Sequence, residues 1–158
     1  MNAIYLLPGN LYGPRDNFDV SSSHVIPAMI RKMLDANARR APEVVCWGDG
    51  TPTREFLYAQ DAAEGIVKAA QRYEGAAPVN LGSGEETSIK DLAELIAELC
   101  EYRGRITWDT SKPNGQPRRK LDTKRAEQCF AFRAQKPLRA GLIETIAWYK
   151  GTLANVSA

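Results

Sequence analysis

Short apolar segments typical of strands alternate with longer segments of helical periodicity along this chain. The strand-like segments are residues 3–7, 44–47, 54–58, 78–81 and 105–109. Helical spacing of apolar residues follows Ser21–Ser23, Asp61, Ser88 and Pro137, and a short helix is expected after Thr123. This alternation predicts an α/β fold. The strands are too few and too scattered for a complete doubly wound sheet, so we expect part of the architecture to be missing.

The first apolar segment, Ala3 to Leu7, stops at Pro8-Gly9, as a fully buried parallel strand would. Such a strand needs a neighbour on each side. Because this one stands at the front of the chain, we expect earlier strands of the same sheet to lie elsewhere. Its free edge would then seek a partner, which predicts self-association through this strand.

Turn-forming residues and caps define the neighbouring elements. Residues 11–17 are rich in turn formers and are predicted to form a loop. The helix that follows is expected to be capped by one of Ser21–Ser23, with Pro27 in its first turn. Ser88 and Asp91 resemble a capping box and open an amphipathic stripe that runs to Cys100. The chain from Gly151 is expected to fray.

Composition excludes several classes of function. The 158 residues include 21 Lys and Arg against 19 Asp and Glu, a net charge of +2 that gives no support for binding nucleic acid or anionic membranes. Three scattered cysteines and a single histidine make no recognisable zinc site and indicate a reduced, cytoplasmic environment. No signal peptide or membrane-spanning apolar run is evident, so we expect a soluble cytoplasmic protein.

Two glycine pairs, Gly48/Gly50 and Gly82/Gly84, do not extend to a dinucleotide-binding GxGxxG motif. The positions three residues beyond each pair are Thr53 and Thr87. No GKS or GKT phosphate loop occurs in the chain either. The glycines therefore favour tight turns between strands and helices.

His24 is the one side chain whose usual pKa lies near neutrality, and it stands at a predicted helix start. It could act as a general acid, but on its own it is more typical of a surface or capping histidine. Trp47 and Arg54 flank a glycine-rich turn and would suit a nucleotide base and a diphosphate. Equally, Trp47 could be a core residue and Arg54 a salt-bridge partner.

The run Arg118-Arg119-Lys120, with Lys124 and Arg125 beyond it, is the one concentrated basic stretch. It could bind a phosphate. A solvated face is the more common explanation, and the run lacks the interleaved aromatic residues of a nucleic-acid-binding surface.

Several motifs in order resemble the C-terminal half of GDP-L-fucose synthases, which are extended short-chain dehydrogenases of the NAD-dependent epimerase/dehydratase type. The most particular are SHVIPA at 23–28 and VCWGDGTPTREF at 45–56. NLYGPRDNF at 10–18, NLGSG at 80–84 and SKPNGQPRR at 111–119 with Leu121-Asp122 extend the resemblance over nearly the whole chain. The resemblance implies an α/β substrate-binding portion that carries one residual strand of a Rossmann sheet.

The resemblance also implies an activity and a set of site residues. Enzymes of this family epimerise GDP-4-keto-6-deoxy-D-mannose and then reduce its keto group with NADPH, which gives GDP-L-fucose. His24 matches the acid that reprotonates the sugar carbons. Pro8, Gly9, Asn10 and Leu11, together with His24, match residues beside the cofactor, and Lys32, Trp47, Arg54 and Asn114 match positions that hold the GDP-sugar. At the last of these the family has aspartate, so this chain keeps a hydrogen-bonding group but loses a charge.

Other parts of the family's machinery are not found in this sequence. No tyrosine is followed by a lysine four residues later, and neither the catalytic serine, the cysteine base nor the glycine-rich cofactor loop of the family is recognisable. We therefore expect residues 1–154 to form one substrate-binding domain with a frayed tail at 155–158. We predict that alone it binds no NADP and is inactive. A stand-alone nucleotide-sugar-binding module, an interaction domain, or part of another nucleotide-sugar epimerase or dehydratase remain the alternatives.

Overall fold

The computed structural model describes residues 3–19 and 21–156, which form short strands and five helices. The strands are β1 (Leu6–Pro8), β2 (Asn10–Tyr12), β3 (Glu43–Trp47), β4 (Thr53–Arg54), β5 (Phe56–Tyr58), β6 (Val79–Leu81), β7 (Thr87–Ser88), β8 (Arg105–Asp109) and β9 (Arg118–Arg119). The helices are α1 (Val25–Ala38), α2 (Ala59–Arg72), α3 (Ile89–Leu99), α4 (Lys124–Phe130) and α5 (Leu138–Val156).

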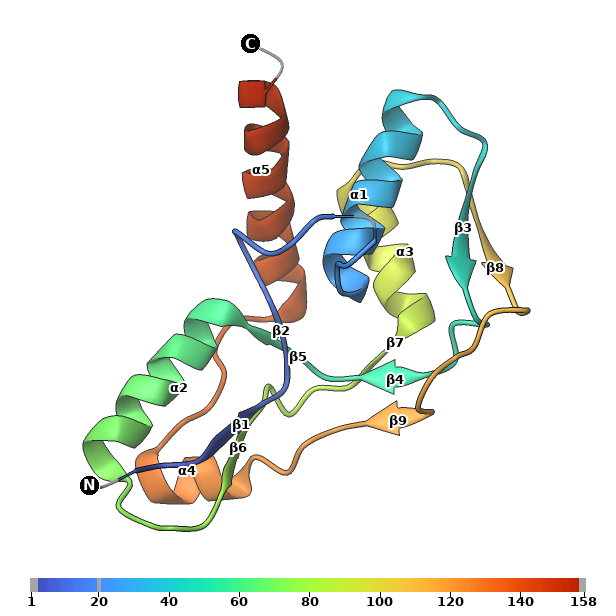
Figure 1. Ribbon diagram of the computed structural model, residues 1–158. Helices are drawn as coiled ribbons and strands as arrows, with labels where there is room; N and C mark the ends of the chain where they lie inside the picture. Colours follow the sequence, from blue (N-terminus) through green and yellow to red (C-terminus); the bar gives the residue numbers. More distant parts are fainter. Residues whose placement is uncertain (1–2, 20, 157–158) are drawn as a thin grey trace.

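Most of the strands pair in parallel. β1 pairs with β6, β2 with β5, and β3 with β8, each in parallel register. β4 lies between β7, which is antiparallel to it, and β9, which is parallel. Helices follow or flank these pairs (Figure 1), so the predicted α/β class is confirmed, including a strand near the start of the chain that belongs to a parallel pair.

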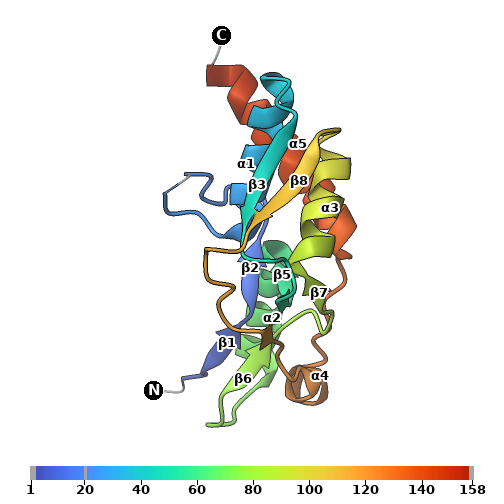
Figure 2. The same ribbon diagram turned by 90° about the vertical axis from the view of Figure 1, so that its right-hand side faces the viewer.

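Two hydrophobic clusters hold the chain together. The larger joins α1, α3 and α5 to β3, and the smaller joins α2, α4 and β6. Figures 1 and 2 place these groups at opposite ends of the molecule, with β2 and β5 running between them. The fully buried side chains of the larger cluster include Ile30, Met33, Leu92, Ile96 and Leu142, and those of the smaller cluster include Leu57, Val79, Leu81 and Phe130.

The start of α3 confirms its predicted cap, whereas the start of α1 does not. Ser88 Oγ accepts the backbone N–H of Asp91 at 2.9 Å. At α1 the N-cap residue is His24, without a side-chain hydrogen bond, so the prediction of a serine cap is wrong. The hydroxyl groups of Ser21 and Ser22 donate instead to Asp19 in the preceding turn, and the Ser23 hydroxyl has no hydrogen-bond partner in the described residues.

Three predicted boundaries also change. Leu11 and Tyr12 are not in a loop, because β2 pairs with β5 and this tertiary pairing overrides the turn-forming neighbours. The predicted strand 54–58 is two strands, β4 and β5, because the chain changes sheets at Glu55. Helix α2 begins at Ala59 and ends at Arg72, before the expected end at Gly75.

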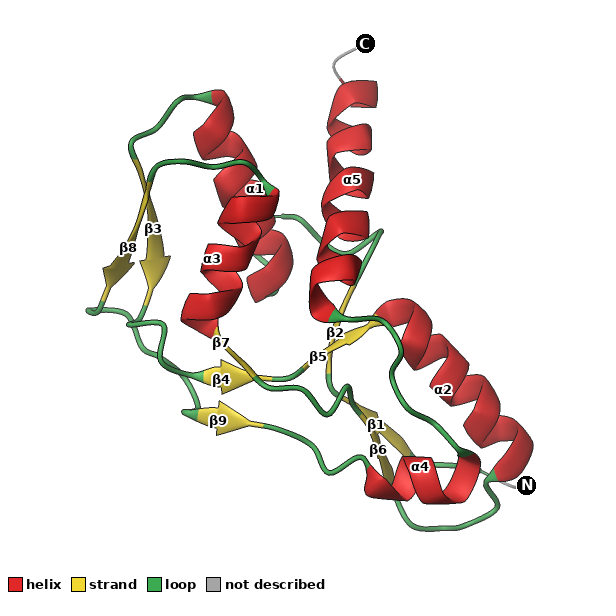
Figure 3. Ribbon diagram, turned by 180° about the vertical axis from the view of Figure 1, so that it is seen from behind, coloured by secondary structure: helices red, strands yellow, loops and turns green. Residues whose placement is uncertain are grey.

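Helix α5 continues to Val156, past Gly151 where we expected fraying to begin. Residues 157–158 of the predicted tail lie outside the described residues. Figure 3 shows α5 from behind, extending away from the rest of the chain. Within the described residues, no helix combines the length and apolar character needed to cross a lipid bilayer.

Strand β1 is less buried than predicted. Leu7 is 37% exposed and the neighbouring Tyr5 is 61% exposed, so the expectation of full burial is wrong for this segment. β1 pairs with β6 along one edge, and no other described strand pairs with it. Tyr5 and Leu7 share one face of the segment, whereas Leu6 on the other face is half-buried, so one face of this segment is left uncovered.

Candidate functional site

A cavity of about 650 Å³ lies where the ends of several elements meet. Its size is within the range of roughly 300–1,000 Å³ typical of small-molecule sites. β1, β2, β3 and β4, the start of α1, the start of α3 and the loop after β8 all reach it. The lining residues are Pro8, Gly9, Asn10, Leu11, Asp16, His24, Val25, Ile26, Pro27, Trp47, Arg54, Phe56, Ile89 and Asn114.

Eight of the nine residues singled out from the sequence line this cavity. They are Pro8, Gly9, Asn10, Leu11, His24, Trp47, Arg54 and Asn114. The chain brings them together because parallel strands end at the same edge and because the loop after β8 folds back over the loop after β3. Lys32 is the residue of this set that the cavity does not include.

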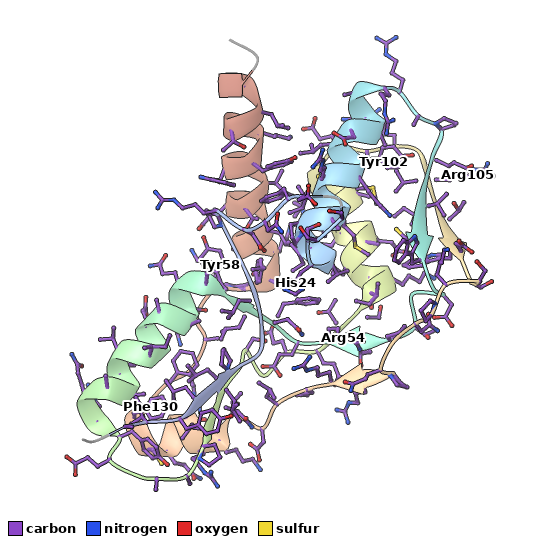
Figure 4. All side chains as sticks on the ribbon, in the orientation of Figure 1. His24, Arg54, Tyr58, Tyr102, Arg105 and Phe130 are labelled. Carbon is purple, nitrogen blue, oxygen red and sulfur yellow. The ribbon has the colours of Figure 1, made fainter. Side chains whose placement is uncertain are left out.

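His24 stands at the first turn of α1 and is exposed. No side chain caps this helix, and its first turn carries no acidic residue. The positive end of the helix dipole therefore remains available to an anion or to a developing negative charge. Figure 4 shows His24 and Arg54 at the centre of the molecule, on the segments between its two ends.

Arg54 and Trp47 are free to meet a ligand. The Arg54 guanidinium donates to the backbone oxygen of Thr53 at 2.7 Å, and no ion pair to Arg54 is present in residues 3–19 and 21–156. Trp47 is 67% exposed, so it is not a core residue. The interpretation of Trp47 as a core residue is therefore wrong, and no described residue forms the salt bridge that was the alternative for Arg54.

Two lysines flank the Trp47 ring. The Nζ atoms of Lys32 and Lys112 lie 5.9 and 5.8 Å from the ring centroid, within cation–π range. They come from α1 and from the loop after β8, so two separate elements bring positive charge to one exposed aromatic ring. This arrangement suits an anion attached to a flat aromatic group.

Lys32 lines a second cavity, of about 620 Å³, between α1 and β3. Its Nζ donates to the backbone oxygen of Val45 at 3.2 Å. Because Trp47 and Ile89 line both cavities, the two cavities adjoin.

Buried Cys46 also lines the second cavity. Burial raises the pKa of its thiol, and the positive charge of Lys32 opposes that shift. Cys46 is therefore a neutral thiol near pH 7 rather than a ready base.

Buried Glu55 ties the segment between β4 and β5 to three other parts of the chain. Its carboxylate accepts backbone N–H groups from Gly84 at 3.2 Å and Leu121 at 2.9 Å. Its backbone oxygen accepts from the Asn10 side chain at 2.8 Å. The Asn10 amide is thus committed to the protein, although the residue lines the cavity.

Sequence reasoning missed three residues here: Asp16, Glu55 and Lys112. Each stands inside a motif that the sequence analysis identified, namely NLYGPRDNF, TPTREF and SKPNG, so these motifs could have pointed to them.

The basic run at 118–120 does not reach the first cavity. Arg118 pairs with Glu86 and, with Lys120 and other residues, lines a separate open hollow. No cluster of His, Cys, Asp and Glu suited to a metal ion occurs in the described part of the chain.

Comparisons with known proteins show which sequences and structures the chain is similar to. Residues 1–82 match the model of the NAD dependent epimerase/dehydratase family. The chain is 45% identical to a protein of Oryza sativa subsp. japonica named "Probable GDP-L-fucose synthase 1", over 94% of this chain and 45% of that protein. It is 42% identical to the GDP-L-fucose synthase of Escherichia coli K12, over 91% of this chain and 47% of that protein. The chain spans just under half the length of these relatives.

A solved structure shows the same architecture. A GDP-L-fucose synthetase from Naegleria fowleri, bound to NADP, superposes with a TM-score of 0.88 at 30% identity. The match covers 96% of this chain and 47% of that protein. The small parallel pairs seen here therefore correspond to part of a larger fold.

Proposed function

Because this chain belongs to the NAD dependent epimerase/dehydratase family, we propose that it is the GDP-sugar-binding portion of an enzyme like the GDP-L-fucose synthases. One observation carries the proposal: His24, Trp47, Arg54 and Asn114, from three separate parts of the chain, line one cavity of suitable size. The second cavity, which adjoins it at Trp47, gives a nucleotide-sugar room to extend.

The charges around the cavities support an assignment for each part of the ligand. Arg54 and the two lysines beside Trp47 would neutralise the diphosphate, and the exposed indole would pack on the base or the sugar. Asn114 would contact the ligand from the loop after β8. His24 would supply a proton to a sugar carbon next to the ketone, a task that needs an acid and correct placement.

The residues proposed to lie beside NADP fit only part of that cofactor. Pro8, Gly9, Asn10 and Leu11 line the cavity but carry no positive charge to meet its phosphates. The reduced form of the cofactor, NADPH, would supply the hydride for reduction. We propose that this chain alone does not retain NADP and is inactive, since its sequence also has no tyrosine with a lysine four residues later.

Two further expectations are proposals. We propose that the chain works in the cytoplasm, as its buried free thiols Cys46 and Cys100 suggest. We also propose that two copies pair through the free edge of β1, where Tyr5 and Leu7 are exposed.

Titration calorimetry with GDP-L-fucose tests the binding function. We expect saturable heat from the 158-residue chain, and its loss in Trp47→Ala and in Arg54→Ala. Arg72→Ala, on the exposed side of α2, is the matched control and should bind normally. An interaction domain without a nucleotide-sugar site would give no heat with any of these proteins, and that result would reject the proposal.

A further inference from the structure

Asn114 holds its own loop in place with one end of its side-chain amide and leaves the other end for a ligand. It lies between β8 and β9, is exposed, and is the one residue of 110–117 that lines the first cavity. Its Oδ1 atom accepts the backbone N–H of Asp49 at 2.9 Å. Because that oxygen is committed to the loop after β3, the nitrogen Nδ2 is the polar side-chain atom left to meet a ligand.

The Nδ2 atom carries two N–H groups. Hydrogen bonds from Thr51 and, to a lesser extent, from the Asn114 side chain lower the pKa of the Asp49 carboxyl, so one N–H is turned toward that group. No acceptor for the other N–H is found in residues 3–19 and 21–156. An amide whose oxygen is already bonded can only donate, so the ligand atom that Asn114 meets must be an acceptor.

Positive charge lies on both sides of this donor. Two positions earlier in the chain, Lys112 Nζ lies 5.8 Å from the centre of the Trp47 ring. One position later, a Cβ atom added to Gly115 would lie 3.6 Å from Arg54 Nη2, so the backbone there packs close to the guanidinium. Arg54 lines the first cavity together with Asn114. The loop therefore presents its amide between a lysine and an arginine, where an anion would bind.

We infer that Asn114 Nδ2 donates a hydrogen bond to a phosphate oxygen of the bound GDP-sugar, and this inference rests on the proposed function. The diphosphate oxygens only accept hydrogen bonds near pH 7, which matches a group that can only donate. The amide adds a donor without adding a charge. A carboxylate at position 114 would instead repel the diphosphate and oppose its attraction to Arg54.

Asn114→Asp separates the donor from the link between the loops, because a carboxylate oxygen can still accept the Asp49 N–H. In titration calorimetry we expect this variant to bind GDP and GDP-L-fucose more weakly by the same factor, about tenfold or more, from the lost hydrogen bond to a charged group and the added repulsion. This factor should grow when the ionic strength is lowered from about 0.3 M to about 0.03 M, because salt screens the repulsion between charges.

Two further variants serve as controls. Asn114→Ala removes the donor without adding a charge, so its affinity for GDP should lie between those of wild type and Asn114→Asp. Gln128→Glu also changes an amide to a carboxylate, on the exposed side of α4 and outside both cavities, and should bind as wild type does. If urea unfolding shows that Asn114→Asp does not fold, Asn114→Ala decides the question, and normal GDP binding by that variant rejects the contact.

The other outcomes separate this inference from the function on which it rests. If Asn114→Asp binds GDP as tightly as wild type or more tightly, Asn114 does not donate to the diphosphate, while the proposed function stands. Weaker binding of GDP-L-fucose alone would place the contact on the sugar, and a factor that does not change with ionic strength would place it on an uncharged part of the ligand. If the wild-type chain binds neither ligand, the proposed function fails, and the inference fails with it.

Discussion

The side-chain oxygen of Asn114 accepts a hydrogen bond from the backbone nitrogen of Asp49 at 2.9 Å. This bond joins the loop after β8 to the loop after β3, between residues 65 positions apart in the chain. The loop after β3 needs glycine at position 48. Gly48 has a φ of +79°, and a Cβ atom added there would collide with the side-chain oxygen of Asn114.

Replacing Gly48 by alanine should disturb both the turn and the cavity wall. We expect Gly48→Ala to lower the free energy of unfolding by about 1–3 kcal/mol, from the left-handed backbone conformation and the displaced Asn114. GDP-L-fucose binding should weaken as well, because Asn114 lines the cavity. Chemical denaturation and titration calorimetry measure the two effects.

Gly151→Ala is the control for this change. Gly151 lies in helix α5 with nothing within 4 Å of an added Cβ atom, so alanine should leave stability unchanged or raise it slightly. Equal stability of Gly48→Ala and wild type would show that the turn does not need glycine.

The type of most elements could be predicted from local patterns in the sequence. The stripe from Ile89 to Leu99 has its own cap at Ser88, so α3 needed no tertiary information. Strands β3 and β8 were also recognisable, from a short apolar run and from alternation. β2 was not, because Leu11 and Tyr12 become a strand only when β5 lies beside them.

Residue types and motifs identified most residues of the candidate site, but they did not identify the hydrogen bonds between distant segments. Nothing local marks Glu55 as the acceptor for Gly84 and Leu121, because these partners are distant in the chain. In the same way, Trp47 is exposed because it shares the open face of β3 with Glu43 and Val45, while the other face packs on the core. Which face of the strand is covered is decided by tertiary packing, so a core position was an equally good interpretation of the sequence.

Glu55→Gln should destabilise the protein. One carboxylate oxygen accepts from Gly84 and the other from Leu121, whereas glutamine would turn an NH₂ group toward one of these N–H donors. We expect the free energy of unfolding to fall by about 1–3 kcal/mol, the cost of leaving a buried polar group without a partner. Urea unfolding followed by circular dichroism provides the measurement.

The control for Glu55→Gln is Glu64→Gln on the exposed side of α2, which should change stability little. If the two variants are equally stable, the Glu55 carboxylate does not hold the loops together.

The free edge of β1 predicts concentration-dependent self-association. Sedimentation velocity at micromolar concentration should show a dimer, and Leu7→Lys should shift it to monomer, because a charge on an edge strand opposes pairing. Ile66→Lys introduces the same charge at an exposed apolar site on α2 and should leave the dimer intact. A wild-type chain that sediments only as monomer would contradict the proposed pairing.

The ion pair between Glu86 and Arg118 predicts loss of stability in acid. Arg118 donates two hydrogen bonds to the Glu86 carboxylate, at 2.8 and 2.9 Å, and Thr53 donates another. These bonds, chiefly those from Arg118, lower the pKa of Glu86 from 4.5 to about 2. Folding therefore favours the ionised carboxylate, so its contribution is present above pH 4.5 and is lost as the pH falls toward 2.

Between those pH values, wild-type stability should fall more steeply than that of Glu86→Gln, which has no carboxylate to protonate at this position. Urea unfolding at a series of pH values gives the two profiles. Glu94→Gln, on the exposed face of α3, should follow the wild-type profile, since no ion pair to Glu94 is found in the described part of the chain. Parallel profiles for wild type and Glu86→Gln would mean that the pair adds nothing to stability, as is true of many exposed ion pairs.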